Sequence, residues 1–529
     1  MNHETTPGRS TLPLVAAAGL LALLFVPHSL AQSLIPGDLL VSRSTYDGIA
    51  STVTVGQALP GGGTAVADGS SLNVFNNETP DPSFGITSSI LLDQYNTSSN
   101  SVDNTIDLTQ AAANQGVNLS TSFPSKSELA LNVSTDGSAV TFMGYVAPVN
   151  TLDVSNSNTP GHVDATNPVA LTYQRAVAQL SLNGTLSITP TNAYSGNNGR
   201  SAVLAGGNYY TVGNAGNGSG TEPTNIVNNT GVQTTTPGGS ANTTVVGQQQ
   251  GTPGASNGFE FGYAATPADK SGKDDNFRGL TVFNNTLYVT KGSGSNGVNT
   301  VYQVGATGSV NNLAANASTT TFSILSGFNT TSAKTATTGP NLFGLFFANA
   351  STLYVADEGD GTAADAATST WAGLEKWVNS KADGTGTWTK AYTLTSGLGL
   401  GSSYTVSGKL ANGTSGSITT LTDGLRNITG VVNGSNVTLY AVTSTAGSSV
   451  TDSGADPNKL VAITDTLGDT TLAQASGESF TTLETAAYGD VLRGVALAPI
   501  PEPSTYAALM GIAALGCATI ARRRRLSRV

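Results

Sequence analysis

Cysteine and histidine are almost absent from this sequence. The 529 residues contain one cysteine, Cys517, which lies in an apolar segment near the C-terminus. No disulfide can therefore form within the chain, and the part that precedes this segment has no thiol nucleophile. Of the three histidines, only His162 lies beyond residue 31, in a stretch rich in Pro, Asn and Thr. This scarcity argues against a zinc site and against a Ser-His-Asp triad.

Charged residues are also few, at 10% of the chain, and acidic residues outnumber basic ones by 33 to 22. The two ends, 1–31 and 500–529, hold six of the basic and two of the acidic residues. The region between them therefore carries 31 acidic and 16 basic residues, a net charge of −15 against −11 for the whole chain. Nucleic acid and anionic lipid surfaces repel such a region.

The C-terminus combines three features in a fixed order. A Pro-Glu-Pro motif is followed by an apolar run over 506–521, and then by four consecutive arginines. Sixteen residues make a helix of about 24 Å, slightly shorter than a bilayer core of about 30 Å. The arginines remain on the cytoplasmic side, because guanidinium groups cross lipid at high cost. The motif residues are Pro501, Glu502 and Pro503, and the basic tail is Arg522, Arg523, Arg524 and Arg525.

This tail resembles the PEP-CTERM sorting signal of exported bacterial proteins. The resemblance implies that an exosortase, a membrane protease-transpeptidase, recognises Pro501–Pro503 and releases the chain from a transient anchor in the inner membrane. The protein would then reach the cell surface or the extracellular space. An ordinary C-terminal membrane anchor is the alternative.

The N-terminus has the pattern of a signal peptide. Residues 1–11 are polar and include Arg9, 12–26 form an apolar core, and small residues follow at 29–31. Signal peptidase cleavage between Ala31 and Gln32 is the expected outcome; an uncleaved signal-anchor is the alternative. The chain thus divides into a signal peptide (1–31), an exported domain (32–499) and a sorting signal (500–529).

The exported domain is predicted to be all-β. No 3.6-residue apolar period persists, and short runs rich in Val, Leu, Tyr and Thr alternate with Gly, Asn, Ser and Asp clusters. One unit recurs: a polar or arginine start, an apolar strand, an Asn or Gly turn, and a strand centred on tyrosine. Its copies begin near Arg200, Phe277, Leu342 and Leu425, and a variant without arginine begins near Ala130.

Further strands follow each tyrosine strand, which indicates the four-stranded blades of a β-propeller. The segment Leu492–Leu497 resembles the first strand of a unit, and Asp38–Arg43 resembles a missing partner strand. Their pairing would close a ring of about six blades, with seven as the alternative count, and would remove an exposed edge. The region also resembles secreted propeller-like proteins that carry the same sorting tail. A parallel β-helix and a β-sandwich pair are the rival folds.

Low-complexity segments separate some of the strands. Residues 150–168, 213–257 and 306–340 consist mostly of Gly, Asn, Thr, Ser, Gln and Pro. We interpret them as long surface loops. The Gly-rich run at 292–297 precedes a strand rather than a helix, so it is predicted to be a turn and not a nucleotide-binding loop.

Two groups of charged residues are candidates for a binding site. The loop after the Tyr354 strand could hold Ca²⁺, although glycines stand where an EF-hand would place ligands and a solvated acidic turn is the preferred interpretation. Its carboxylates are Asp357, Glu358, Asp360 and Asp365. Arginines at the start of the inner strands could bind an anionic sugar in the central channel, but we favour a structural role in tying the blades together. These are Arg200, Arg278, Arg426 and Arg493.

The sequence contains no recognisable catalytic signature, and we assign no catalytic residue and no required cofactor. We therefore expect a non-catalytic surface or extracellular-matrix protein that binds or organises exopolysaccharide. A passive component of an envelope layer is a second hypothesis. An extracellular polysaccharide hydrolase or lyase is the third, since glycoside hydrolysis needs only two suitably placed acids. The acids that could supply them are Asp274, Asp275, Asp357, Glu358 and Glu375.

Overall fold

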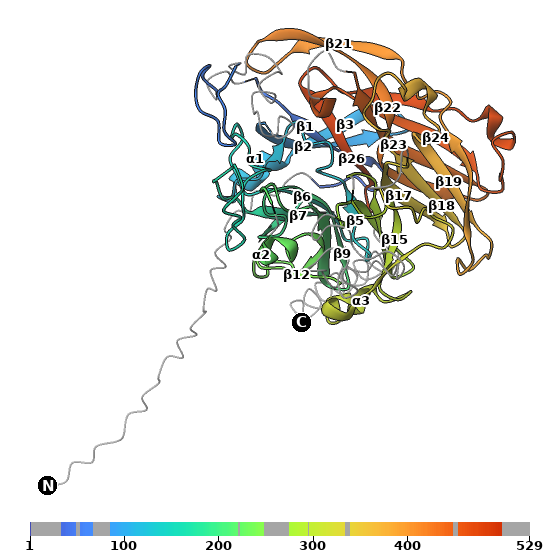
Figure 1. Cartoon of the computed structure of the whole chain (residues 1–529), viewed down its shortest axis with the longest axis horizontal. Coiled ribbons are helices and arrows are strands. Elements are labelled where there is room, and N and C mark those ends of the chain that lie inside the picture. Colours follow the sequence, from blue (N-terminus) through green and yellow to red (C-terminus); the bar gives the residue numbers. More distant parts are fainter. Residues whose placement is uncertain are drawn as a thin grey trace.

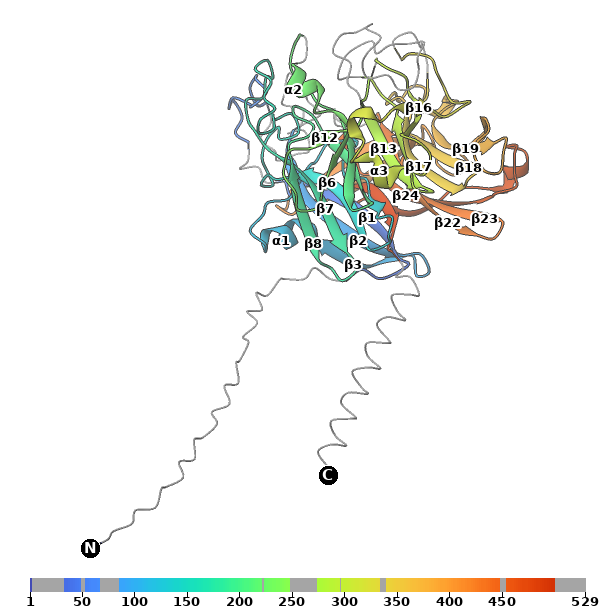
Figure 2. The same cartoon turned by 90° about the horizontal axis from the view of Figure 1, so that it is seen from below.

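The computed structural model describes residues 1, 33–48, 53–66, 85–220, 223–247, 274–294, 296–333, 339–447 and 453–499. Within them, six antiparallel sheets surround a central axis, and the chain passes round the ring from blade to blade (Figure 1). The molecule is a six-bladed β-propeller, as the sequence predicts. Viewed at right angles, blades 1 and 2 lie on one side of the ring and blades 5 and 6 on the other (Figure 2).

Each blade has four strands, which we list from the axis outward. Blade 1 holds β26 (Asp490–Leu497), β1 (Leu39–Thr45), β2 (Thr87–Asn96) and β3 (Ser101–Asp107), and β4 (Thr121–Ser122) also pairs with β2. Blade 2 holds β5 (Asn132–Val133), β6 (Ala139–Tyr145), β7 (Arg175–Ser181) and β8 (Leu186–Thr191). Blade 3 holds β9 (Gly199–Ala205), β10 (Asn208–Gly213), β11 (Gly231–Thr235) and β12 (Thr244–Val245).

The second half of the ring repeats this order. Blade 4 holds β13 (Phe277–Phe283), β14 (Thr286–Lys291), β15 (Thr300–Val304) and β16 (Phe322–Ile324). Blade 5 holds β17 (Leu342–Asn349), β18 (Thr352–Asp357), β19 (Gly373–Asn379) and β20 (Trp388–Leu394). Blade 6 holds β22 (Ser415–Asn433), β23 (Asn436–Ala446), β24 (Lys459–Thr466) and β25 (Thr481–Thr485), and β21 (Ser403–Lys409) extends it beside β22.

Helical segments are short and lie in the connections. They are α1 (Leu108–Ala113), α2 (Thr224–Val227), α3 (Val310–Leu313) and the 3₁₀ turns η4 (Ala317–Thr319), η5 (Ala366–Thr368), η6 (Ser453–Ala455) and η7 (Gln474–Gly477). Within the described part of the chain, no helix has the length and apolar character needed to cross a bilayer.

The ring closes by pairing of the two ends of the propeller, as predicted. Strand β26 runs antiparallel to β1, with Leu39 opposite Leu497 and Thr45 opposite Asp490. The last strand of the chain thus becomes the innermost strand of the first blade. This arrangement leaves neither β1 nor β26 as an unpaired inner edge.

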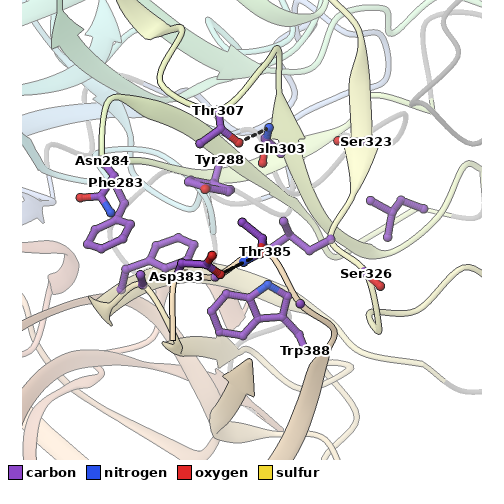
Figure 3. A pocket seen from close by; sticks show the side chains of 16 residues that line it. Phe283, Asn284, Tyr288, Gln303, Thr307, Ser323, Ser326, Asp383, Thr385 and Trp388 are labelled. Carbon is purple, nitrogen blue, oxygen red and sulfur yellow. Dashed lines mark hydrogen bonds between the residues drawn. The ribbon is translucent and has the colours of Figure 1, made fainter. Parts of the chain in front are cut away.

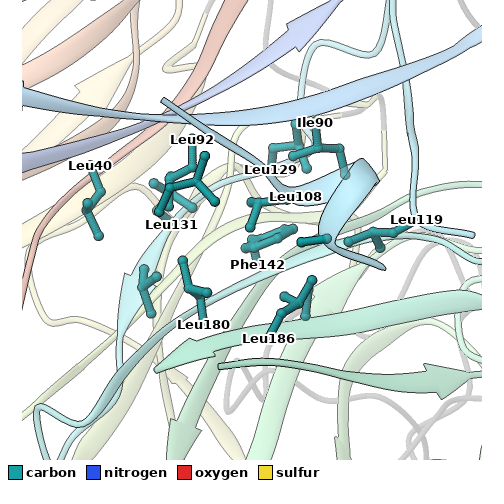
Figure 4. Close-up of a cluster of buried hydrophobic side chains, with 14 of the residues drawn as sticks. Leu40, Ile90, Leu92, Leu108, Leu119, Leu129, Leu131, Phe142, Leu180 and Leu186 are labelled. Atoms are coloured by element: carbon teal, nitrogen blue, oxygen red, sulfur yellow. The ribbon is translucent and has the colours of Figure 1, made fainter. Parts of the chain in front are cut away.

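Among the described residues, each of the six blade interfaces holds a hydrophobic cluster, and a further cluster joins the β21–β22 hairpin to blade 1. Figure 4 shows the cluster between blades 1 and 2, where Leu92 of β2 and Phe142 of β6 are fully buried. Equivalent clusters lie between blades 2 and 3, 3 and 4, 4 and 5, 5 and 6, and 6 and 1. A single blade therefore buries its apolar faces only when both of its neighbours are present.

Glycines in the inner strands allow these strands to approach closely around the axis. A Cβ atom on Gly344 of β17 would lie 2.7 Å from the carbonyl oxygen of Arg426 in β22. Gly279 of β13 faces the carbonyl of Phe343 in the same way, and Gly494 of β26 faces that of Leu129. In blades 1, 4 and 5 this position is therefore glycine for steric reasons, whereas blades 3 and 6 have Ser201 and Asn427 after their arginines.

Three parts of the sequence differ from the prediction. The low-complexity segment 213–257 is not one long loop, because it contains α2 and the outer strands β11 and β12, whose Val232 is buried. Segment 306–340 likewise contains α3, η4 and β16, and much of 150–168 is buried. Thr, Gln and Asn can form strands and buried turns when backbone and side-chain hydrogen bonds satisfy them, so their abundance hid these elements. Outside these three segments, β21 and the first part of β22 also escaped prediction, whereas the part of β22 from Leu425 onward was predicted.

Candidate functional site

The arginines of the repeat lie on inner strands, and three of them connect blades. Arg200 donates through Nε to Ser127 Oγ at 3.0 Å and through Nη1 to the carbonyl of Phe277 at 2.7 Å. It thereby joins the chain before β5, its own strand β9 and β13. These bonds hold the guanidinium group of a buried arginine in place. They agree with the structural role that we favour from the sequence.

Two further arginines tie blade 6 to its neighbours. Arg426 of β22 forms an ion pair with Glu358, which follows β18, at 2.9 Å from Nε to Oε2. Arg493 of β26 donates to Ser44 Oγ and to the carbonyl of Gly454, both at 3.0 Å. Each contact crosses from one blade to another or across the ring closure.

Arg278 differs from the other three. Its Nε donates to Ser293 Oγ at 2.8 Å, and Ser293 belongs to the same blade. Burial would raise the pKa of Glu358, but the positive charges of Arg278 and Arg426 hold that pKa below its usual value. Glu358 is therefore an anion that balances two channel arginines.

The other candidate acids are occupied by structural partners. Asp357 is completely buried, and its two oxygens accept the backbone N–H groups of Asn341 and Gly359 at 2.8 and 2.9 Å. Burial, together with the nearby carboxyl of Glu375, raises the pKa of Asp357 to about 8. Asp274 and Asp275 lie apart from this group, before β13, where Asp275 accepts a hydrogen bond from Thr230 at 3.4 Å.

The four carboxylates of the calcium candidate do not converge. Asp357 turns to backbone amides and Glu358 to Arg426, whereas Asp360 and Asp365 line a cavity of about 490 Å³. Among the described residues, no group of three or more His, Cys, Asp or Glu side chains is placed to hold a metal ion. The structure therefore gives the calcium prediction no support. His162 is half-buried on a loop, with Nδ1 2.9 Å from the carbonyl oxygen of Asn225.

The strongest candidate site is an aromatic cavity between blades 4 and 5, which we call the Trp371 cavity. It has a volume of about 370 Å³ and opens where β15, β17 and β19 begin. Trp371 lines it together with Phe328 and Trp377, whose rings stack with centroids 3.8 Å apart. The hydroxyls and amide of Asn329, Thr330 and Thr331 complete its wall.

An ion pair forms the charged part of this cavity. Glu375 Oε1 lies 2.9 Å from Lys390 Nζ, and its Oε2 accepts a hydrogen bond from Trp377 Nε1 at 2.9 Å. Lys390 Nζ also lies 4.1 Å from the centroid of the Trp371 ring, in the range of a cation–π contact. Burial raises the pKa of Glu375, although Lys390 opposes that shift. The ammonium group thus joins the carboxylate to the indole face.

Sequence reasoning placed Glu375 among possible acids but missed the tryptophans as a group. The chain has only three, Trp371, Trp377 and Trp388, and all three line cavities between blades 4 and 5. Their clustering within 18 residues was visible in the sequence. Only the packing of β19 against blade 4 shows that they share one interface.

The C-terminal match to a known family is short. Residues 499–525 match the PEP-CTERM protein-sorting motif. The chain carries this sorting signal. The signal implies processing by an exosortase, export, and transient membrane anchoring before surface display. Its residues Pro501–Pro503 and Arg522–Arg525 lie outside the described part of the chain, as do Cys517 and the signal cleavage site at Ala31 and Gln32.

Comparison with other proteins adds little about the propeller. No curated protein matches the chain. Among solved structures, the chain is similar to a GH32 β-fructofuranosidase from Bombyx mori in complex with sucrose, at 12% identity and a TM-score of 0.28, over 60% of this chain and 57% of that enzyme's length. It is also similar to a glycosyl hydrolase from Bacteroides ovatus, at 9% identity and a TM-score of 0.25, over 61% of this chain and 82% of the other.

Proposed function

We propose that this PEP-CTERM protein is a non-catalytic surface protein that binds exopolysaccharide through the Trp371 cavity. The observation that carries the proposal is the combination of a half-buried indole ring, a lysine over one face of that ring and neutral polar groups in one cavity. A sugar ring has an apolar C–H face and a hydroxyl edge. Aromatic side chains match the first, and amide, hydroxyl and ammonium groups match the second.

The partners follow from the two ends of the chain. Signal peptidase would remove 1–31, and the exosortase would act at the Pro-Glu-Pro motif. The propeller would then reach the cell surface or the extracellular matrix, where polysaccharide is the abundant partner. The net charge of −15 estimated for the exported region supports a neutral or weakly charged polymer over nucleic acid.

Binding is favoured over catalysis by the state of the acids. A glycoside hydrolase needs two carboxyl groups that both face the substrate. Glu375 lines the cavity, but Lys390 and Trp377 occupy its two oxygens. Asp357 has a raised pKa, which suits a general acid, yet it is fully buried beneath backbone amides. A hydrolase or lyase remains the alternative, and Asp357 with Glu375 is the pair it would use.

The test compares substitutions at two aromatic residues, Trp371 and Tyr404, each of which has a lysine ammonium group over its ring. Protein secreted by the producing cells is mixed with their own exopolysaccharide, and bound protein is measured together with polymer length. Trp371→Ala is expected to weaken binding about tenfold, the effect of losing about 1.4 kcal/mol of stacking. Tyr404→Ala is the control, because Lys459 covers that ring at 4.0 Å in the same way on the β21 hairpin.

Three outcomes separate the candidate functions. Binding that is saturable, leaves the polymer intact and falls only in Trp371→Ala supports a polysaccharide-binding protein. Shortening of the polymer that is lost in Glu375→Gln would establish the enzyme instead. Equal binding by all variants would disprove the role of the Trp371 cavity.

A further inference from the structure

A second cavity lies at the same blade interface, and Figure 3 shows it. We call it the Trp388 cavity; its volume is about 300 Å³. Leu342, the first residue of β17, lines the Trp371 cavity, whereas Phe347, near the end of that strand, lines the Trp388 cavity. These two residues lie about 17 Å apart along β17. The cavities come close together elsewhere, because Ser326 and Trp388 line one and Gly327 and Lys390 line the other. The two cavities therefore have separate linings and adjoin along one blade interface.

Aromatic rings form the floor of the Trp388 cavity. Phe283 of blade 4 stacks on Phe347 of blade 5 with centroids 4.8 Å apart, and Tyr288 packs against the same ring at 4.6 Å. Trp388 meets Phe347 edge-on at 6.0 Å. Blade packing accounts for Phe347 and Trp388, which are nearly buried. It does not account for Phe283, which stays partly exposed beside the polar groups of the rim.

The rim supplies neutral hydrogen-bonding groups. Gln303 donates through Nε2 to the carbonyl of Gly305 at 2.9 Å, which directs its amide group along the rim. Asn284, Ser323 and Thr385 are exposed and also line the cavity. Among the residues that the structure describes, none accepts a hydrogen bond from Trp388 Nε1. The cavity thus offers both donors and acceptors above an aromatic floor.

One charge is present, and it is negative. Asp383 is exposed, and its carboxylate accepts hydrogen bonds from the backbone N–H and hydroxyl of Thr385 at 3.0 and 2.7 Å. No lysine or arginine lines this cavity, in contrast to the Trp371 cavity with Lys390. An anionic sugar would lie beside this carboxylate, and Lys381 interacts with Asp383 from outside the cavity lining.

We infer that the Trp388 cavity is a second saccharide-binding site, which takes an uncharged sugar residue and excludes uronic acids. Its ligand class rests on the proposed function, but its residues are separate from those of the Trp371 cavity. The floor stacks on the C–H face of the sugar, and the rim binds its hydroxyls. Its volume, at the small end of ligand cavities, suits one or two sugar rings.

The three tryptophans allow each cavity to report its own binding. In the full chain with Trp371→Phe and Trp377→Phe, Trp388 is the sole tryptophan, so its fluorescence reports the Trp388 cavity. With Trp388→Phe, the emission reports the Trp371 cavity. Each form is titrated with neutral cello- and manno-oligosaccharides and with oligogalacturonate.

We expect a saturable change in Trp388 emission with a neutral oligosaccharide. The affinity for oligogalacturonate, measured in the same way, should be at least tenfold lower. Ser323→Phe at the cavity rim should abolish that change, whereas Ser417→Phe on the exposed β22 hairpin should not. Asp383→Asn should reduce the difference in affinity between the neutral oligosaccharide and oligogalacturonate. No change in Trp388 emission, or equal affinity for the charged ligand, would overturn the inference. If the Trp388→Phe form, whose emission reports the Trp371 cavity, is the only form that does not respond to ligand, the result would count against the Trp371 cavity and not against this inference.

Discussion

The glycine in the inner strands is the residue on which close packing around the axis depends. Gly344→Ala would place a methyl group 2.7 Å from the carbonyl oxygen of Arg426 and 2.9 Å from the amide nitrogen of Ile428. Backbone atoms cannot move aside without shifting a whole blade, so we expect a loss of about 1–3 kcal/mol or more in unfolding free energy. Urea denaturation measures it. Gly468→Ala, in open space, is the control and should cost under 1 kcal/mol.

The ion pair between Arg426 and Glu358 makes a second prediction at the residue scale. Removing the arginine leaves a largely buried carboxylate with one fewer cation, and Arg426→Ala should cost about 3 kcal/mol. Arg278→Ala should cost less, because its Nε bond goes to a serine hydroxyl. Equal losses in the two variants would contradict the assignment of Arg426 as the blade-linking residue.

The free energy of unfolding should depend on pH through two carboxyl groups whose pKa values are shifted in opposite directions. The folded-state pKa of Glu358 is depressed, so its contribution is present above pH 4.5 and is lost as the pH falls through the folded pKa. Arg426→Ala should therefore reduce the loss of stability in acid.

Asp357 has the opposite sign. Its folded pKa is about 8, so the unfolded chain releases this proton more readily, and stability should fall as the pH rises from about 4 to 8. Asp357→Asn should flatten that slope in urea titrations at several pH values, even though it weakens one of two backbone hydrogen bonds. An unchanged slope would show that Asp357 ionises normally.

At the scale of elements, the sequence predicted strands well where apolar residues alternate around an Asn or Gly turn. The hairpin of β13 and β14 is an example, since Asn284 and Asn285 both have positive φ, as a tight two-residue turn requires. It failed where strands are made of Thr, Gln and Ser, as in β11, β12 and β21. These strands lack the alternation of apolar residues by which strands are recognised, and their pairing with neighbouring strands is not encoded in composition alone. The cavities escaped prediction for the same reason, because they form between blades.

Closure of the ring makes a prediction about single elements. Deleting β26 would expose the inner edge of β1 and remove part of the core between blades 6 and 1. We expect loss of cooperative unfolding and binding of a hydrophobic dye. Deleting the exposed residues 470–473, in the connection after β24, is the control and should leave one cooperative transition. Cooperative unfolding without β26 would contradict the closure mechanism.

At the scale of the whole molecule, two cavities along one blade interface would make the protein bivalent. Their linings share no residue, so each cavity can hold a sugar residue of its own. A bivalent protein cross-links the polymer when its two cavities bind two polymer segments at once. At a large excess of protein, each segment is bound by a different protein molecule and the cross-links are lost.

The viscosity of a neutral exopolysaccharide solution should therefore rise with added protein and then fall at high excess. Trp371→Ala and Ser323→Phe should each remove the rise, although each variant still binds the polymer through its other cavity. Ser417→Phe should behave as the unmodified protein. A rise that persists when either cavity is disabled would mean that the protein cross-links the polymer by self-association and not through two sites. Separate binding measurements on the same samples distinguish this outcome from simple loss of binding.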